Sequence, residues 1–528
     1  MVSRLAYAAL VVGAAFVACS PSNGSLGDTC DNHGDCGSDL QCVASVCVAR
    51  CHRAPECGDG YACNRDGICT LADGQSGDRC KSEVDCAPGL SCQLDMTIGD
   101  DGHLVASCAA SVVGRPAGSR CFSDVDCSNG TCALGHCVDL CTETPDCSSG
   151  TQCMTIPRIE ARGVPFMGCL PSHGSLVWTI PVLSPTQEIL LPIPSAARSA
   201  QLTMTIDDVA QKVGAQTIVS PGGTVIYDKP CDPQNPVTPM ENCTERDAAD
   251  MYYDEHQKVR HLPLAGQSTL EIPIGVPPNE QLLVPGPYRI KVSSFRSNGT
   301  AGSAIPRLTA VAKLDSSVTL DLHFYFLDLD DHPCRAAFAG GTLDAATANV
   351  EPYFQSDYLG ELRTIFAGGG IVLGTSTFED VTDHPDLDGL SIEAAGSLLS
   401  LGSHAEGINV FFVRTLSPVG LQAFAPNPGP AQQPNTRQSG IIVSADTLCY
   451  RSWPQLARLT AHELARYMGL YHNVELEHTQ APDEYPSWLD QIPDTDGAVS
   501  NLMFFSELGG IELTAGQREI LTKSAVLR

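Results

Sequence analysis

Two histidines, a glutamate and an arginine near the C-terminus form the part of this sequence best suited to chemistry. His462 and Glu463 are adjacent, Arg466 follows three residues later, and His472 lies a little further on. If residues 453–468 form one helix, positions 462 and 466 share a face, because residues four apart project together. Imidazole nitrogens bind metal ions, and a carboxylate beside a metal can activate water. The pattern therefore predicts a site of the metal-dependent hydrolytic kind.

The sequence also supplies start and stop signals for this helix. Ser452 is a suitable N-cap, and Pro454 falls in the first turn, where a missing N–H is tolerated. Gly469 suits the left-handed residue that ends many helices. We expect the chain to turn sharply there, so that His472 returns beneath the face that carries His462.

The segment from His462 to His472, H-E-L-A-R-Y-M-G-L-Y-H, resembles the H-E-x-x-H-x-x-G-x-x-H motif of metzincin zinc proteases. The downstream segment N-L-M-F, which contains Met503, lies where those proteases have their Met-turn. The resemblance covers residues 318–528 and is closest to pappalysin-like and bacterial lipoprotein members. It implies zinc held by His462 and His472, water activation by Glu463, and Met503 packed below the metal.

Arg466 departs from that motif, because it stands where the second histidine belongs. A guanidinium offers five donors and no lone pair, so it cannot ligate zinc. At roughly 4 Å from a dication, in an effective dielectric of about 20, its charge would cost about 8 kcal/mol. Either Arg466 swings away and another group completes the site, or the metal is absent and Arg466 pairs with Glu463.

Other polar side chains offer weaker candidates for the site. Four that follow His472 could replace the missing ligand, although an ordinary loop residue is the simpler interpretation of each: Glu475, His478, Asp483 and Tyr485. His384 and His404 have no partner in the pattern. The acidic stretch from Asp380 to Asp388 fails the spacing of an EF-hand calcium loop, so we interpret it as a turn.

Alternating strands and helices are predicted around the motif. Residues 320–326 alternate as a strand with one buried face, and a helix is expected from Asp344 to Phe366, before three glycines. Further strands are expected at 371–373, 408–413 and 441–443, with a short helix at 392–401. The strand at 408–413 is predicted to be an edge that binds extended peptide, and residues 425–439, with four prolines, to be a surface loop. T-A-G-Q at 514–517 has the spacing of a capping box for a terminal helix.

Residues 175–315 have a different hydrophobic pattern, in which short runs of alternating apolar residues are interrupted by Pro and Gly. Period two without long helical stretches predicts an antiparallel β-sandwich. Cys231 and Cys243 flank a loop rich in Pro and Asn, and we expect them to form a disulfide.

Residues 27–170 contain a cysteine repeat. Twenty of the 25 cysteines lie between Cys30 and Cys169, in five units that begin at Cys30, Cys51, Cys80, Cys121 and Cys141. The units hold few large apolar residues, so disulfides must stabilise them, at roughly 2–4 kcal/mol each. A zinc cluster would need C-x2-C pairs, which are missing. The array predicts a stalk or a protein-binding module, and the connectivity within it stays open.

Cys334 and Cys449 remain after the other cysteines are assigned. Cys334 follows the first strand of the C-terminal region, and Cys449 directly precedes the motif helix. By elimination and position we expect them to be bonded to each other.

The N-terminus has the features of an export signal. Residues 1–18 carry one arginine and then an apolar run that is too short to span a bilayer. The sequence F-V-A-C ending at Cys19 resembles the lipobox of bacterial lipoproteins, although Phe16 is larger than usual. We expect lipidation of Cys19, a tether over 19–26 and an outer-membrane or cell-surface location; a plain secretory signal is the alternative.

The composition and net charge limit the classes of molecule that this chain is expected to bind. Hydrophobic residues make up 43% of the 528, which is typical of a globular chain. A formal charge of −30 disfavours nucleic acid and anionic membrane surfaces. We therefore expect a protein or peptide ligand, and contact with a membrane through the lipid anchor alone.

The predicted fold is multidomain: disulfide-rich small modules, an all-β sandwich, and an α/β metzincin-like domain over 318–528. Two functions follow. The favoured one is a pseudoenzyme that lost its zinc and acts as a binding or scaffold protein, because the replacement at Arg466 has the wrong charge. The alternative is an active zinc-dependent endopeptidase that cleaves extracellular proteins or peptides.

Overall fold

The computed structural model divides the chain into two compact units, residues 1–101 with 105–111, and residues 102–104 with 112–528. Within the described ranges, no helix has the length and apolarity needed to cross a bilayer. The structure describes residues 29–31, 35–38, 40–43, 46–49, 61–64, 69–71, 74–99, 104–228, 260–261, 264–272, 283–296, 300–327, 329, 332–418, 420–474, 492–506 and 508–528.

The first unit consists of short antiparallel hairpins. One two-stranded sheet joins β1 (Leu40–Val43) to β2 (Val46–Ala49). The next sheet has the order β4-β3-β5-β7-β6. Its strands are β3 (Tyr61–Asn64), β4 (Cys69–Leu71), β5 (Asp78–Arg79), β6 (Leu90–Ile98) and β7 (Leu104–Ala110).

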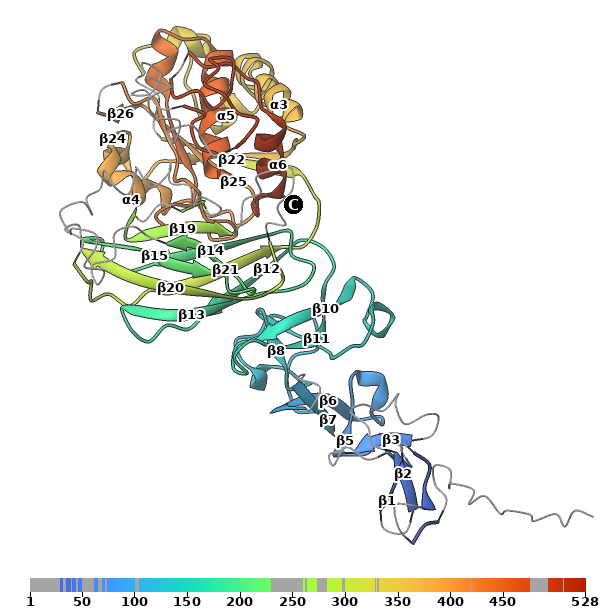
Figure 1. The fold of residues 1–528 in the computed structure, drawn as a ribbon. Coiled ribbons are helices and arrows are strands. Elements are labelled where there is room, and N and C mark those ends of the chain that lie inside the picture. The colour runs from blue at the N-terminus through green and yellow to red at the C-terminus, as the bar shows by residue number, and fades with distance from the viewer. Residues whose placement is uncertain are drawn as a thin grey trace, which may run out of the picture. The chain divides into compact units, whose positions relative to one another are not determined.

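The second unit begins with two more cysteine modules, in blue-green in Figure 1. Each is built on a single hairpin. The strands are β8 (Cys132–Ala133) with β9 (His136–Cys137), and β10 (Thr151–Arg158) with β11 (Val164–Pro171).

The modules share one disulfide pattern, in which the first cysteine bonds the third and the second bonds the fourth. The described bonds are Cys30–Cys42, Cys36–Cys47, Cys80–Cys92, Cys86–Cys108, Cys121–Cys132, Cys127–Cys137, Cys141–Cys153 and Cys147–Cys169. Cystine sulfurs also form the buried apolar clusters around Cys30 and Cys121. The predicted disulfide-rich modules are therefore confirmed for these bonds.

An aspartate before the second cysteine orders the turn in these modules, and the sequence analysis missed it. Asp126 accepts hydrogen bonds from the backbone N–H groups of Phe122 at 2.7 Å and Ser123 at 3.0 Å. These bonds lower the pKa of Asp126. The same contacts recur at Asp85 and Asp146. The repeated D-C dipeptide was the available signal.

Two antiparallel sheets follow and lie face to face (Figure 1). Their inward side chains are apolar and buried, as the alternating pattern predicts. The first sheet has the order β12 (Ser175–Ile180), β21 (Arg307–Lys313), β14 (Ser199–Thr205), β19 (Gln267–Ile272), β17 (Arg260–His261). The second has the order β13 (Thr186–Ile193), β20 (Gly286–Arg296), β15 (Gln211–Val219), β16 (Val225–Asp228), with β18 (Leu264–Ala265) also beside β15.

The C-terminal region contains a mixed five-stranded sheet of order β23-β22-β25-β28-β27. The first four strands run parallel and β27 is antiparallel. Its strands are β22 (Thr319–Leu327), β23 (Val372–Val381), β25 (Ile408–Val413), β27 (Ala423–Phe424) and β28 (Ile441–Ser444). A separate parallel pair joins β24 (Gly389–Ser391) to β26 (Thr415–Ser417).

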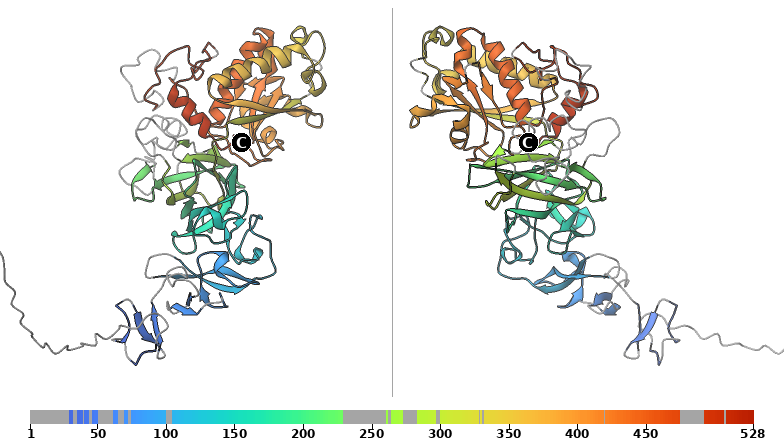
Figure 2. Two further views of the ribbon diagram at one scale, coloured as in Figure 1. Left: turned by 90° about the vertical axis from the view of Figure 1, so that its right-hand side faces the viewer. Right: turned by 60° about the vertical axis from the view of Figure 1, so that its left-hand side comes forward.

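Helices cover both faces of this sheet. α3 (Leu359–Gly368) and α5 (Trp453–Tyr467) share one apolar core with the sheet, while α4 (Ala395–Leu399) packs on the other face (Figure 2). The other α-helices in the described part of the chain are α2 (Ala345–Ala348) and α6 (Ala515–Lys523). The side chain of Thr514 accepts from Gln517 N–H, so the predicted cap of the terminal helix is confirmed. The whole body after the modules is thus mostly β-sheet with few helices.

Three predictions about the strands and helices of this region were wrong. β22 is buried on both faces, because the segment carrying α4 covers the side expected to face solvent. The helix expected from 344 to 366 is broken into α2, a π-helical stretch at Tyr353–Tyr358 and α3. The strand at 408–413 is internal, between β22 and β28, so it offers no free edge.

Candidate functional site

α5 carries the candidate site, and its ends follow the sequence signals. Ser452 N–H donates to the Gln455 side chain at 2.9 Å in a capping box, with Pro454 in the first turn. Gly469 has φ of +98°, a left-handed conformation that favours glycine. Leu470 N–H then donates to Ala465 O at 3.0 Å, which closes the turn.

This turn brings the two histidines together. The ring centroids of His462 and His472 lie 5.1 Å apart. His462 is buried, and its Nδ1 lies 2.8 Å from the carbonyl oxygen of Leu502, so Nδ1 is the protonated nitrogen. Burial lowers the pKa of His462 well below its ordinary value, and the charges of His472 and Arg466 lower it further. The His462 imidazole is therefore neutral, with its lone pair on Nε2.

Glu463 lies buried beside them. Burial raises the pKa of its carboxyl, although the nearby Arg466 guanidinium opposes the rise. Arg466 Nη1 is 3.9 Å from Glu463 Oε2, close enough for charge attraction and too far for a hydrogen bond. The arginine side chain is 26% exposed, and its guanidinium lies beside Glu463. Of the two arrangements considered from the sequence, this geometry is the one in which Arg466 faces Glu463.

Met503 is fully buried in a segment that braces the same site. Its N–H donates to Asn501 Oδ1 at 2.8 Å, and its carbonyl accepts from Asn473 N–H at 3.1 Å. This segment therefore connects the chain after His472 to the carbonyl that holds His462.

Arg458, which the sequence analysis overlooked, also braces this segment. It is buried and donates to the carbonyl oxygens of Leu502, Ser506 and Gly510 at 2.9–3.1 Å. Its position one turn before His462, on the same face of the predicted helix, was the available signal.

Residues 425–431 cover the C-terminal part of α5, and the prediction of a surface loop there was wrong. All seven residues are buried. Tyr467 Oη donates to Pro430 O at 2.8 Å, and Gly429 N–H donates to Tyr467 O at 2.9 Å. A Cβ at Gly429 would lie 2.0 Å from the Tyr467 ring, so glycine permits this contact. The backbone N–H of Ala425 also reaches Glu463.

Gln201 of the sandwich holds this covering segment from the other side. Its Nε2 donates to Gly429 O at 2.8 Å, and its Oε1 accepts from Ala431 N–H at 2.6 Å. These long-range bonds satisfy backbone groups that a prolyl stretch cannot pair within itself. The prolines led to the prediction that this segment is exposed, but its contacts with residues distant in the sequence bury it.

Within the part of the chain that the structure describes, the donor set at α5 falls short of the set that a zinc ion needs. Among the described residues, no set of three ligand atoms within 4.8 Å of one another includes His462, Glu463 or His472. The sets that do occur are cysteine groups and His332 with Cys334 and Cys449. Two imidazoles beside a fixed positive charge fall short of the three neutral or anionic ligands that zinc sites use.

Other predicted site residues are placed as follows. Cys334 and Cys449 form the predicted disulfide, with Cα atoms 5.2 Å apart. His404 stacks on His323 with centroids 3.7 Å apart and contacts Glu379 at 2.7 Å, so it belongs to a separate polar group. The other residues singled out from the sequence that lie outside the described part of the chain are Cys19, Cys231, Cys243, Glu475, His478, Asp483 and Tyr485.

Comparison with models of protein families finds no match to this chain, and comparison with curated proteins finds none.

Proposed function

We propose that this chain is an exported lipoprotein whose metzincin-like C-terminal domain has lost its catalytic metal site and acts as a binding or scaffold protein. The observation that carries the proposal is the position of Arg466 beside the buried carboxylate of Glu463, with Nη1 3.9 Å from Oε2. A permanent cation occupies the place beside His462 where a metal would need a lone pair.

The metzincin-like part is supported by the arrangement around α5. One helix and one glycine turn gather His462, Glu463, Arg466 and His472, and Met503 lies buried in the segment that supports His462. These are the positions at which the resemblance calls for a metal site. The proximity of these side chains supports the proposal.

The scaffold part is supported by how the site is closed. The buried segment 425–431 and the N–H of Ala425 lie over the side of α5 that bears Glu463. A hydrolytic glutamate needs room for water and substrate, whereas this one is desolvated and faces an arginine.

Metal analysis of the purified protein tests this function. We expect far less than one equivalent of zinc and no peptidase activity. Arg466→His should raise zinc occupancy, because it restores a lone pair beside His462 and His472. Arg466→Leu is the matched control, since it removes the charge without adding a ligand and should leave occupancy low. Stoichiometric zinc in the unmutated protein, with proteolysis abolished by Glu463→Ala, would instead establish the alternative, an active zinc-dependent endopeptidase.

The lipoprotein part rests on Cys19 and is tested separately. Mass spectrometry of protein from the membrane fraction should find Cys19 as an acylated N-terminus. A free thiol there, or cleavage further along the chain, contradicts lipidation and favours a secreted protein. An anchor of this kind would place the binding surface at the outer membrane or cell surface.

A further inference from the structure

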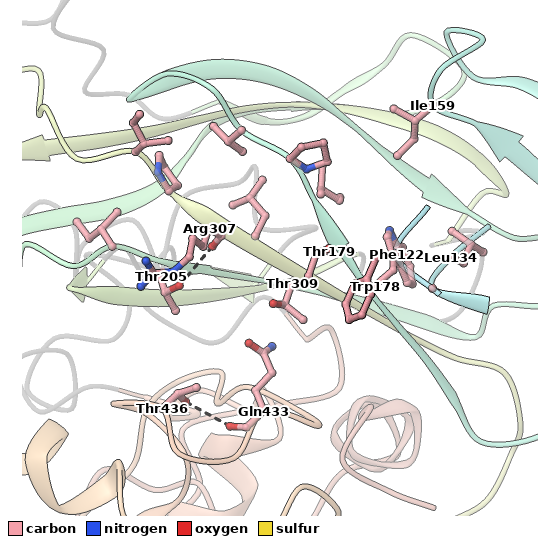
Figure 3. Close-up of a pocket in the computed structure, with 18 of the residues that line it drawn as sticks. Phe122, Leu134, Ile159, Trp178, Thr179, Thr205, Arg307, Thr309, Gln433 and Thr436 are labelled. Atoms are coloured by element: carbon pink, nitrogen blue, oxygen red, sulfur yellow. Dashed lines mark hydrogen bonds between the residues drawn. The ribbon is translucent and has the colours of Figure 1, made fainter. Parts of the chain in front are cut away.

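A cavity far from the candidate site in sequence lies in the second unit, where three parts of the chain meet. Its volume is about 1430 Å³. The last two cysteine modules, the edge of the first sandwich sheet and the loop at 433–437 form its walls (Figure 3). The apolar lining includes Phe122, Leu134, Ile159, Trp178, Pro181 and Pro306.

The unpaired edge of strand β12 faces this cavity. Leu314 N–H donates to Gly174 O, and the register pairs Ser175 with Lys313, so the even-numbered residues of β12 bond to β21. The backbone groups of Val177 and Thr179 therefore point outward. No hydrogen bond to the outward groups of Thr179 is made by the residues that the structure describes, and Thr179 itself is exposed.

The cysteine module beside β12 covers one part of the edge of this strand and leaves the next part uncovered. Arg120 Nη1 donates to Val177 O at 3.0 Å. Gly135 approaches the same carbonyl so closely that a Cβ there would lie 2.4 Å from it. The unprotected stretch thus begins at Thr179, inside the cavity.

Two further N–H donors at the cavity wall lack acceptors among the described residues. They are the buried indole Nε1 of Trp178 and Nε2 of Gln433. Figure 3 shows Gln433 rising from its loop toward the strands that carry Thr309 and Trp178. Buried donors without acceptors are costly. Both atoms are shielded by neighbouring protein atoms, so an occupant that brings carbonyl oxygens would satisfy them after a small shift of the two side chains.

Most charged groups of the lining are paired with neighbouring residues, and the two others, Asp208 and Arg437, have opposite charges. Arg307 contacts both carboxylate oxygens of Asp207, and Arg158 contacts Asp124 at 2.6 Å and Glu160 at 2.8 Å. The cavity therefore presents an apolar and hydrogen-bonding surface with little unbalanced charge. An uncharged occupant matches it better than an acidic or basic one.

We propose that this cavity binds an extended, uncharged, apolar peptide segment of another protein, which adds to the free edge of β12 at Thr179. Main-chain pairing at a sheet edge provides affinity, and pockets for alternate side chains provide selectivity. The carbonyl groups of the peptide would reach Gln433, and its apolar side chains would contact Phe122 and Pro181. This inference deepens the proposed scaffold role, and its test is separate, since zinc measurements concern α5 alone.

The test is selection of a phage-displayed library of random peptides on the full-length purified protein, followed by affinity measurements with the enriched synthetic peptides. Thr179→Pro removes only the outward N–H, a change that edge strands tolerate. Thr179→Val keeps that N–H and is the matched control. We expect enriched peptides to bind Thr179→Pro about three- to tenfold more weakly than the unmutated protein, with Thr179→Val unchanged.

Gln433→Leu provides a second variant should Thr179→Pro fail to fold, and a similar loss of affinity is expected. Thermal unfolding of each variant identifies those that fold. Equal peptide affinity in all folded variants, or no enrichment over an unrelated protein, overturns the proposal. Binding of glycans from an array, lost in Gln433→Leu, also overturns it and assigns the cavity to carbohydrate.

Discussion

The cysteine modules and the C-terminal sheet region solve the same stability problem by different means. In the modules, the clusters of buried apolar groups around Cys30 and Cys121 are made almost entirely of cystine. In the C-terminal region, one core joins large aromatic residues of the sheet and helices, including Phe324, Phe354 and Phe412. Short units without large side chains depend on covalent links, whereas a long segment can bury enough apolar surface to fold around it.

Reduction should separate the two regions most strongly. Loss of both disulfides from a module removes roughly 4–8 kcal/mol, which exceeds what so small a core can supply. After treatment with a reductant, limited proteolysis and mass spectrometry should find cleavage throughout 121–169 before cleavage in β22 or α5. If the reduced modules stayed resistant to the protease, or if the sheet were cleaved first, the modules would not depend on their disulfides more than the C-terminal region does.

A cavity in the aromatic core should destabilise the C-terminal region alone. Phe412 is fully buried, with ring centroids of Phe326 and Tyr358 at 5.4 and 5.7 Å. Phe412→Ala should lower the free energy of unfolding by about 3–5 kcal/mol. Chemical denaturation measures this loss, with Val372→Ala, at a 61% exposed position, as the near-neutral control. A change below about 1 kcal/mol for Phe412→Ala would contradict the core assignment.

Lys313 joins the sandwich to the C-terminus through a buried ammonium group. Its Nζ donates to the carbonyl oxygens of Ser317, Ser524 and Leu527 at 2.6–3.3 Å. Burial lowers its pKa from 10.5 to about 8. Between these pH values the unfolded chain holds more protons than the folded one, so this group makes stability increase as pH rises from about 8 toward 10.5, by roughly 3 kcal/mol.

The variant Lys313→Met tests the contribution of this buried ammonium group to stability. Stability measured against pH should show the rise in the unmutated protein and a smaller rise in the variant. The variant should also be less stable by about 2 kcal/mol, because three carbonyl groups lose a donor. Parallel pH profiles for the two proteins would show that Lys313 does not titrate in this range.

The smallest effect is expected at the surface ion pair of Arg307 and Asp207. The two side chains are 65% and 84% exposed, so water screens their attraction. Arg307→Ala should change the melting temperature by no more than corresponds to about 1 kcal/mol. A larger loss would indicate that residues lining the cavity also support the sandwich.

Local signals made much of the candidate site predictable. Ser452, Pro454 and Gly469 set the ends of α5, and the four-residue spacing put His462 and Arg466 on one face. Cap and turn preferences depend on a few neighbouring residues, so the sequence contains them. The cysteine repeat likewise predicted disulfide-linked modules, although it left the pairing open.

The sequence by itself determined where α5 begins and ends, which units are disulfide-linked, and that Arg466 lies on one helix face with His462. Only the tertiary structure decided that residues 425–431 are buried, that the strand at 408–413 is internal, and that β22 is covered on both faces. Each of these depends on partners distant in the chain. Gln201 bonds to residues 429 and 431 across more than two hundred positions. Local sequence carries no record of such a partner, because the bond forms only after both segments have packed against α5 and the sandwich.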